Sequence, residues 1–376
     1  MREEFHGWYP KDAKELKQVW SEALFVPDAN ILLHCLRHQA HVRERLLEIL
    51  GKLGSSLWIP YQVGLEFQRN RLLVEASALD AYDQLQVEMK KFVAQGTDRL
   101  RQLRAHPMID QEAEVAHLDK YLEGFVGRLA AMRANHPDQH VAEAVDRLGE
   151  IFKGRVGPPW AHERLLAVKK EGEDRYARKV PPGYMDDRKD ADPFAKYGDL
   201  IIWKDMIAKA KADGRPVIFI SDDAKEDWWR LHRGRKLGVR PELVEEFQRE
   251  AGQAFHMYEL GQFLRVAAEQ RTDIEQATVE LVEKSLQEDE QARRAIETNA
   301  EHQSVKRQLL ELEGERTELI THLTGVPVHG EARGVEAMDR PTVRARLARL
   351  QEEIAALTFE LRRKEEESGL PTSEDE

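Results

Sequence analysis

Five acidic residues stand out because each follows a strand-like run or opens a helix-like one. Asp28 follows the apolar run LFVP, and Asp222 and Asp223 follow VIFIS. Glu66 and Asp199 open the segments GLEFQ and GDLIIW, each shortly after a glycine. Since ligands of open parallel sheets bind beyond the carboxyl ends of the strands, we expect these acids to share one site.

Such a site predicts metal-dependent chemistry. Carboxylates packed together raise one another's pKa unless a cation neutralises them. The oxygen-preferring ions Mg²⁺ and Mn²⁺ fit best, and they polarise phosphoryl oxygens, so hydrolysis of a phosphodiester is the predicted reaction. Taken singly, each acid also has an ordinary alternative: a helix or turn cap for Asp28 and Asp199, a helix surface for Glu66, and a solvated turn for Asp222 and Asp223.

Competing chemistries find little support. The histidines are scattered, and Cys35 is the only cysteine, which excludes a disulfide framework and a cysteine-rich zinc site. GKLG at 51–54 lacks the spacing and the Ser or Thr of a phosphate-binding P-loop. Without a signal-peptide pattern or a long apolar stretch, a cytoplasmic setting is the expectation.

Charge is distributed unevenly. The net charge of the chain is -12, but residues 271–376 hold 15 Lys+Arg and 25 Asp+Glu, a net of -10, which leaves -2 for residues 1–270. Basic residues gather ahead of Asp199, and a substrate phosphate could use this basic cluster, although a solvated face is an equal alternative. Its members are Lys169, Lys170, Arg175, Arg178, Lys179, Arg188, Lys189 and Lys196.

Hydrophobic periodicity predicts an α/β fold with a parallel sheet. Strands are expected in ALFVP, SSLWIPYQV, PVIFIS and AFHMY, with helices near 11–21, 41–53, after 64, 198–213, 241–251 and through Leu264. Between 69 and 184 the pattern is helical and polar, which indicates an inserted helical region. We therefore divide the chain into 1–68, 69–184, 185–268 and 269–376.

The last segment, 269–376, is a helical tail. Apolar residues step by four and three through 305–323 and again through 343–361, and a Gly- and Pro-bearing stretch separates the two runs. This pattern predicts a helical hairpin or short coiled coil with a disordered end. The tail would mediate self-association or docking of a protein partner, with intramolecular packing as the equal alternative.

The motifs together resemble a known family. VPDANILL, then Glu66, then GDLIIW and FISDDAKEDWW resemble the four-acid signature of the PIN nuclease domain. The order of PPGYMDDRK, YGDLIIWKDMI and SDDAKEDWW is similar to that in bacterial PIN-like proteins with a large helical insertion. The resemblance spans roughly residues 20–268, and a PIN-like three-layer fold follows from it as an expectation.

The resemblance implies a Mg²⁺- or Mn²⁺-dependent endonuclease that acts on RNA or DNA, with a role in stress response or defence. It implies Asp28, Glu66, Asp199 and Asp223 as catalytic ligands. In the family the last motif reads Ser or Thr, any residue, then Asp, which Ser221 and Asp223 match. Asp222 would then bind a second ion or lie in a turn. The gap between Glu66 and Asp199 exceeds that of small toxin-type PIN proteins, so the substrate class stays open.

Further residues are candidates around these acids. Asn30 matches the polar residue two positions after the first aspartate, and Lys225 is placed to neutralise transition-state charge. Trp228 and Trp229 are candidates for base stacking or for the core. Residues expected to contact substrate are Arg69, Tyr184, Arg188 and Lys189.

Two other functional classes remain open. One is a catalytically silent interaction protein that acts through the insertion and the tail. The other is a nucleic-acid-binding module that uses the metal only for binding. The presence of acids at all four positions favours the enzyme.

Overall fold

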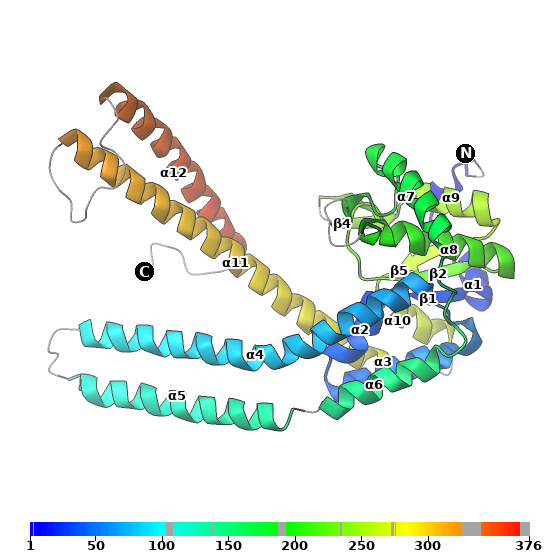
Figure 1. Cartoon of the computed structure of the whole chain (residues 1–376), viewed down its shortest axis with the longest axis horizontal. Coiled ribbons are helices and arrows are strands. Elements are labelled where there is room, and N and C mark those ends of the chain that lie inside the picture. The colour runs from blue at the N-terminus through cyan, green and yellow to red at the C-terminus, as the bar shows by residue number, and fades with distance from the viewer. Residues whose placement is uncertain are drawn as a thin grey trace. The chain divides into compact units, whose positions relative to one another are not determined.

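The computed structural model describes residues 1–2, 4–102, 108–136, 138–186, 193–233, 235–271, 274, 276–324 and 340–368. The chain divides into two compact units, Met1–Ser285 and Leu286–Glu376 (Figure 1). The predicted contacts of Arg188 and Lys189 lie outside the described residues. The boundaries proposed for the helical insertion stay a prediction.

A parallel three-stranded sheet forms the centre of the first unit. Its strand order is β1 (Leu24–Pro27), β2 (Val217–Ile220) and β5 (Phe255–Tyr258). Every residue of β1 and β2 is buried, as is typical of parallel strands covered on both faces. The sheet confirms the α/β class.

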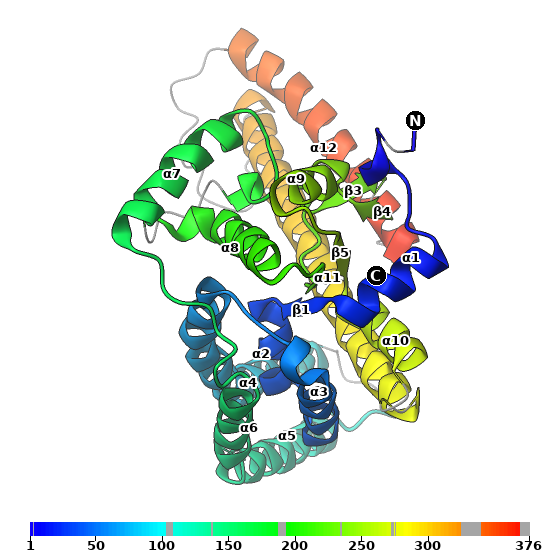
Figure 2. The same ribbon diagram turned by 90° about the vertical axis from the view of Figure 1, so that its right-hand side faces the viewer.

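Helices cover both faces, which gives three layers (Figure 2). On one face, Ile220 of β2 lines a small apolar gap with residues of α2 (Ala29–Arg37), α3 (Ala40–Leu53) and α10 (Leu260–Gln270). On the other face, Phe255 of β5 packs against Trp203 of α8 (Gly198–Asp213) and Phe247 of α9 (Pro241–Ala251). Trp20 of α1 (Ala13–Glu22) contacts Phe25, Tyr258 and Phe263.

The predicted strand in SSLWIPYQV did not form as a ladder. Leu57 makes an isolated parallel bridge to Phe25, and Ile59 makes one to Val156. Pro60 follows at once, and helix α4 begins at Tyr61, so the extended run is too short for a strand of the sheet.

Long helices occupy the region between Glu66 and Asp199. They are α4 (Tyr61–Gln102), α5 (Gln111–Ala134), α6 (Asp138–Ile151) and α7 (His162–Ala177). Figure 1 shows α4 and α5 side by side over most of their length. Short 3₁₀ helices are η1 (His6–Trp8), η2 (Gly54–Ser56), η3 (Tyr184–Asp186) and η4 (Ala195–Tyr197).

An antiparallel hairpin that the sequence did not lead us to expect follows the last acid motif. It consists of β3 (Trp229–His232) and β4 (Arg235–Val239), in which His232 pairs with Arg235 across a two-residue turn. Arg233 has a positive φ of 49°, as turns of this length require.

The second unit is a pair of packed helices. α11 (Gln276–Thr324) starts in the first unit, and α12 (Arg340–Ser368) packs on its second half. Leu319, Val343 and Leu350 form the small core of this pair, and Arg346 bonds Glu315 through two nitrogens at 2.7 and 2.8 Å.

Candidate active site

Asp28 lies where β1 ends and α2 begins. Its Oδ1 accepts a hydrogen bond from the Ala29 backbone N–H at 2.7 Å, which caps the helix. Its Oδ2 accepts from Ser221 Oγ and from Asn30 Nδ2, both at 2.8 Å. Asp28 is therefore a helix cap through one carboxylate oxygen, while its other oxygen bonds the polar residues of the candidate site.

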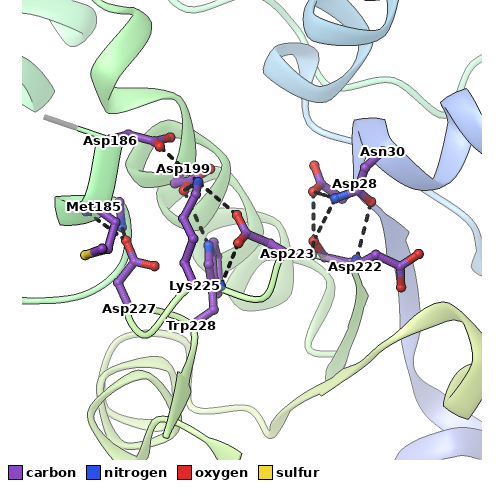
Figure 3. A network of polar contacts seen from close by, with 12 residues as sticks. Asp28, Asn30, Met185, Asp186, Asp199, Asp222, Asp223, Lys225, Asp227 and Trp228 are labelled. Carbon is purple, nitrogen blue, oxygen red and sulfur yellow. Dashed lines mark hydrogen bonds and ion pairs between the residues drawn. The ribbon is translucent and has the colours of Figure 1, made fainter. Parts of the chain in front are cut away.

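Ser221 joins the first and last acid motifs. The residue is fully buried after β2, and the Asp223 backbone N–H donates to its Oγ at 3.1 Å. Since the same hydroxyl donates to Asp28, it ties the loop after β2 to the end of β1 (Figure 3). Ser221 and Asn30 thus hold Asp28 in position.

Glu66 and Asp199 meet across Gly198. A Cβ built on Gly198 would lie 2.7 Å from Glu66 Oε1, so the missing side chain lets the carboxylate approach the start of α8. Gln62 Nε2 donates to the same oxygen at 2.8 Å. On the other side of Asp199, a Cβ on Gly183 would lie 3.1 Å from the Asp199 Cβ. The long helical region therefore returns the chain so that the second and third acids come together.

Lys225 lies among three aspartates. Its Nζ is 2.9 Å from Asp223, 3.0 Å from Asp186 and 3.6 Å from Asp199 (Figure 3). Burial alone lowers the pKa of Lys225, but Asp199 and Asp223 outweigh burial and hold the pKa well above its usual value. The ammonium group is thus charged and balances part of the site's negative charge.

Two further acids lie at the site, and neither was predicted as a metal ligand. Asp186, in η3, is 8% exposed and pairs with Lys225. Asp227 is fully buried, and its Oδ2 accepts from the backbone N–H groups of Gly183 and Met185 at 2.9 and 3.1 Å. Asp227 therefore holds the loop that carries Asp186. The only signal was the density of acids in PPGYMDD and SDDAKED, and loops have no period that tells which ones face inward.

Asp222 is turned away from the other acids (Figure 3). Its Oδ1 accepts from the Leu260 backbone N–H at 2.8 Å, at the start of α10, and its Oδ2 lies 2.9 Å from His34 Nε2. Burial raises the pKa of Asp222, but the bonds from His34 and Leu260 outweigh burial and lower it overall. Its predicted role as a second metal ligand finds no geometric support.

The pKa values of two acids report a concentration of negative charge. Burial, followed by the charge of Glu66, raises the pKa of Asp28 to about 7. Burial also raises the pKa of Asp199 to about 8, where Lys225 opposes the shift and Asp186 and Asp223 add to it. One lysine does not compensate this many carboxylates.

The donor set fits a hard divalent cation. Its members offer carboxylate oxygens, and a cation would relieve the repulsion that raises these pKa values. Among the described residues, however, no group of three or more acidic, histidine or cysteine side chains converges as a ready-made metal site. Part of the reason is visible: Lys225 occupies the space between three aspartates, and Asp28 uses its oxygens for Ala29, Ser221 and Asn30.

The remaining candidates divide into loop and core positions. Tyr184 donates to Glu226 Oε1 and accepts from Arg240 Nη1, both at 3.2 Å, next to the loop that carries Asp186. Arg69 is exposed on α4, one turn after Glu66. Trp228 and Trp229 are 2% and 5% exposed, so both belong to the core. Their indole N–H groups donate to Asp199 Oδ2 at 3.4 Å and to the Asp223 carbonyl at 2.7 Å.

Comparison with known families decides the classification. A family model described as a PIN-like domain matches residues 24–243, more than half of the chain. The chain belongs to the PIN-like domain family. PIN-like domains have a nuclease-type fold, usually act as nucleases and generally use divalent metals, so the family agrees with the chemistry that the acids suggest.

The matched region of the PIN-like domain contains Asp28, Glu66, Asp199 and Asp223 and ends within α9. β5 follows the matched region yet completes the sheet. No curated protein and no solved structure matches the chain. Among the described residues, no helix combines the length and the apolar character needed to cross a membrane.

A separate cavity of about 620 Å³ lies at the other edge of the sheet. Pro216 and Ala254, which precede β2 and β5, line it together with Lys11 and Gln248. The four acids of the site are absent from its lining. The predicted site of the PIN-like domain is therefore distinct from this cavity and lies at the carboxyl edge of the strands, with Asp28 and Asp223.

Proposed function

We propose that this protein is a metal-dependent endonuclease that hydrolyses phosphodiester bonds in nucleic acid. The observation that carries the proposal is that Asp28, Glu66, Asp199 and Asp223, from four distant parts of the chain, lie near enough for their charges to raise one another's pKa values. Burial and mutual repulsion raise the pKa values of Asp28 and Asp199, and such a site requires a cation.

Asp28, Glu66, Asp199 and Asp223 would hold Mg²⁺ or Mn²⁺. When bound, the ion supplies Lewis-acid polarisation of the phosphodiester and neutralises carboxylate charge. The surrounding residues keep the acids in place: Ser221 and Asn30 bond Asp28, and Trp228 bonds Asp199. These contacts spare the acids the cost of reorganising when substrate arrives.

Lys225 is assigned to the charge that develops on the phosphate. Its ammonium group lies within 3.6 Å of three aspartates, so any cation that enters competes with it for the same oxygens. A lysine released from these oxygens is available for a phosphate oxygen, and preorganised cations stabilise transition-state charge strongly. Asp186 is the carboxylate that holds Lys225 in the absence of substrate.

The test is cleavage of single-stranded and duplex RNA and DNA with Mg²⁺ or Mn²⁺. We expect Asp28→Asn and Asp199→Asn each to lower the rate by about 100-fold or more, as removal of a group that stabilises the transition state does. Asp213→Asn serves as the matched control, since Asp213 ends α8 and pairs with Lys209, outside the acid site. Equal rates in wild type and both site variants would refute the assignment.

A second readout does not need activity. A ligand that binds only the folded state raises the melting temperature. We expect Mn²⁺ to raise the melting temperature of wild type and of Asp213→Asn, and to raise it much less in Asp28→Asn. No metal effect together with no cleavage would favour the silent interaction protein. A metal effect without cleavage, but with nucleic-acid binding, would favour the binding module.

A further inference from the structure

The β3–β4 hairpin is strongly cationic. Residues 229–240, WRLHRGRKLGVR, contain five Lys and Arg residues and no acid, although residues 1–270 as a whole have a net charge of -2. The hairpin follows the loop of Asp223 and Lys225 directly. A concentration of one sign of charge beside an acid site calls for an explanation other than general solubility.

The charges at the tip are free to bind a ligand. Arg230 lies over the ring of Trp8 at 5.5 Å, and Lys236 pairs with Glu259 and lies 4.9 Å from the Trp229 ring. By contrast, Arg233 and Arg235 are exposed, and within the described part of the chain neither has an ion-pair partner. Two neighbouring, uncompensated guanidinium groups are a suitable partner for phosphate oxygens.

The base of the hairpin is fixed to the acid site. Trp229, the first residue of β3, is 5% exposed, and its indole N–H donates to the Asp223 carbonyl at 2.7 Å. At the other end, the Arg240 backbone N–H donates to the Trp228 carbonyl at 3.1 Å. A strand rises about 3.3 Å per residue, so His232 lies about 10 Å along β3 from Trp229. That reach equals about three steps along a duplex strand at 3.4 Å each.

We propose that the β3–β4 hairpin binds the phosphodiester backbone of the nucleic-acid substrate, a few nucleotides away from the bond at the acid site. The inference rests on the proposed function and names the element that holds its substrate. The described residues of the hairpin expose no Trp, Tyr or Phe ring, because Trp229 is buried, and His232 is the one exposed ring among them, so the hairpin lacks the large stacking platform that holds unpaired bases. Its contacts are with phosphates, and they position the substrate without selecting a sequence.

The experiment measures binding of the full-length chain in EDTA to fluorescent oligonucleotides, as single-stranded and duplex RNA and DNA, by anisotropy between about 50 and 200 mM salt. We expect Arg233→Glu/Arg235→Glu to weaken binding at low salt by about tenfold or more. The slope of log K against log salt should fall by about 1.8, since each lost phosphate contact with duplex DNA contributes about 0.9. The four substrates distinguish which backbone the hairpin prefers.

Lys14→Glu/Lys17→Glu is the matched control. It changes the net charge equally, on exposed positions of α1, which precedes the amino end of β1. We expect its salt slope to equal that of wild type, and thermal melting of each variant verifies folding. Equal effects of both double variants, no effect of the hairpin variant, or no binding by wild type would each overturn the inference.

Failure of the two proposals can be told apart. Hairpin-dependent binding without metal-dependent cleavage would keep the hairpin assignment and refute the endonuclease. If Asp28→Asn abolishes cleavage but the hairpin variant changes neither KM nor binding, the endonuclease stands and the hairpin assignment is refuted. If both proposals hold, the hairpin variant raises KM while its kcat stays within about threefold of wild type, since uniform binding is what it loses.

Discussion

Asp222 and Asp223 are neighbours with different environments. Asp223 faces Lys225 and is bonded through its backbone N–H to Ser221, which holds Asp28. Both carboxylate oxygens of Asp222 already have partners, one in His34 and the other in the first backbone N–H of α10. Asp223 therefore lies on the side of the proposed site, whereas Asp222 bonds residues of α2 and α10 where these helices meet.

We expect Asp223→Asn to lower metal-dependent cleavage by about 100-fold or more, because the charge that pairs with Lys225 and a metal ligand are lost together. Asp222→Asn should leave the rate within about threefold of wild type, and instead lower the free energy of unfolding by about 1 kcal/mol, the usual loss for a weakened helix cap. Cleavage assays and denaturant unfolding of both variants check this. A larger loss of rate in Asp222→Asn than in Asp223→Asn would reverse the assignment.

At the residue scale, what could be predicted depended on flanking periodicity. Asp28 and the last acid pair follow buried apolar runs, so the strand ends could be located from the sequence alone. Which of two adjacent aspartates faces inward depends on the turn after β2, and both follow the same FIS. Asp186 and Asp227 lie in irregular loops, where the decisive bonds to Lys225 and to Gly183 come from tertiary contacts.

At the scale of elements, a buried ion pair joins α7 to α9. Arg175 bonds both carboxylate oxygens of Glu246 at 2.7 and 2.8 Å, and the two side chains are 8% and 7% exposed. Trp203 of α8 donates to the same carboxylate at 3.2 Å. Arg175 was one of the basic cluster considered for substrate phosphate, but this geometry gives it a structural role. Sequence alone did not distinguish it from its exposed neighbours, since burial depends on α9.

We expect Glu246→Gln to lower the free energy of unfolding at pH 7 by about 3 kcal/mol, because it removes the buried countercharge of Arg175 and leaves only the more exposed Glu171. Glu171→Gln is the control: Glu171 pairs with the same Arg175 but is 40% exposed, so the loss should stay below about 1 kcal/mol. Urea unfolding of the three proteins measures both values. Equal losses of unfolding free energy in the two variants would show that the buried Arg175–Glu246 pair stabilises the fold no more than the exposed Arg175–Glu171 pair does.

The pH dependence has a definite sign. Burial raises the pKa of Glu246, but Arg175 outweighs burial and lowers the pKa below its usual value of 4.5. The ionised carboxylate therefore stabilises the folded state fully above the unfolded pKa, and this stabilisation is lost as pH falls through the lower folded pKa. The difference in unfolding free energy between wild type and Glu246→Gln should accordingly become smaller below about pH 4.5. A gap that widens in acid would contradict the ion pair.

Two elements show why local patterns fall short at this scale. SSLWIP has strand-like composition, yet Pro60 and the start of α4 leave only isolated bridges at Leu57 and Ile59. The strands of the β3–β4 hairpin, WRLH and RKLGV, are only four and five residues long, so their alternation is too short to identify them from the sequence. The sequence signal was the glycine that follows Arg233, since glycine is common where hairpins turn, and Arg233 itself has a positive φ.

At the scale of the whole molecule, the boundary between the two units falls inside a helix. The first turns of α11 belong to the first unit, where Val279 and Val282 are fully buried. Glu283 pairs with Arg265 at 2.7 Å, and Ser285 lies 3.4 Å from His38. The composition changes near residue 270, whereas the first compact unit ends at Ser285.

The apolar seam between α11 and α12, the two helices of the tail, is covered within one chain. Leu319, Val343 and Leu350 are buried between α11 and α12, together with Leu312, Leu323 and Leu347. A seam that is already covered offers little apolar surface to a second copy, so the intramolecular alternative gains weight over self-association.

A pair of truncations tests both statements. A chain that ends at Ser285 should unfold with the same midpoint as the first unit of the full chain, and light scattering should give both the same oligomeric state. A chain that ends at residue 270 lacks Val279 and Val282, and burial of each valine contributes about 1.5 to 3 kcal/mol, so its unfolding free energy should fall by about 3 to 6 kcal/mol. Dissociation of an assembly on truncation at Ser285 would instead show that the tail joins copies of the chain, and equal stability of the two truncated chains would show that α11 contributes nothing to the PIN-like unit.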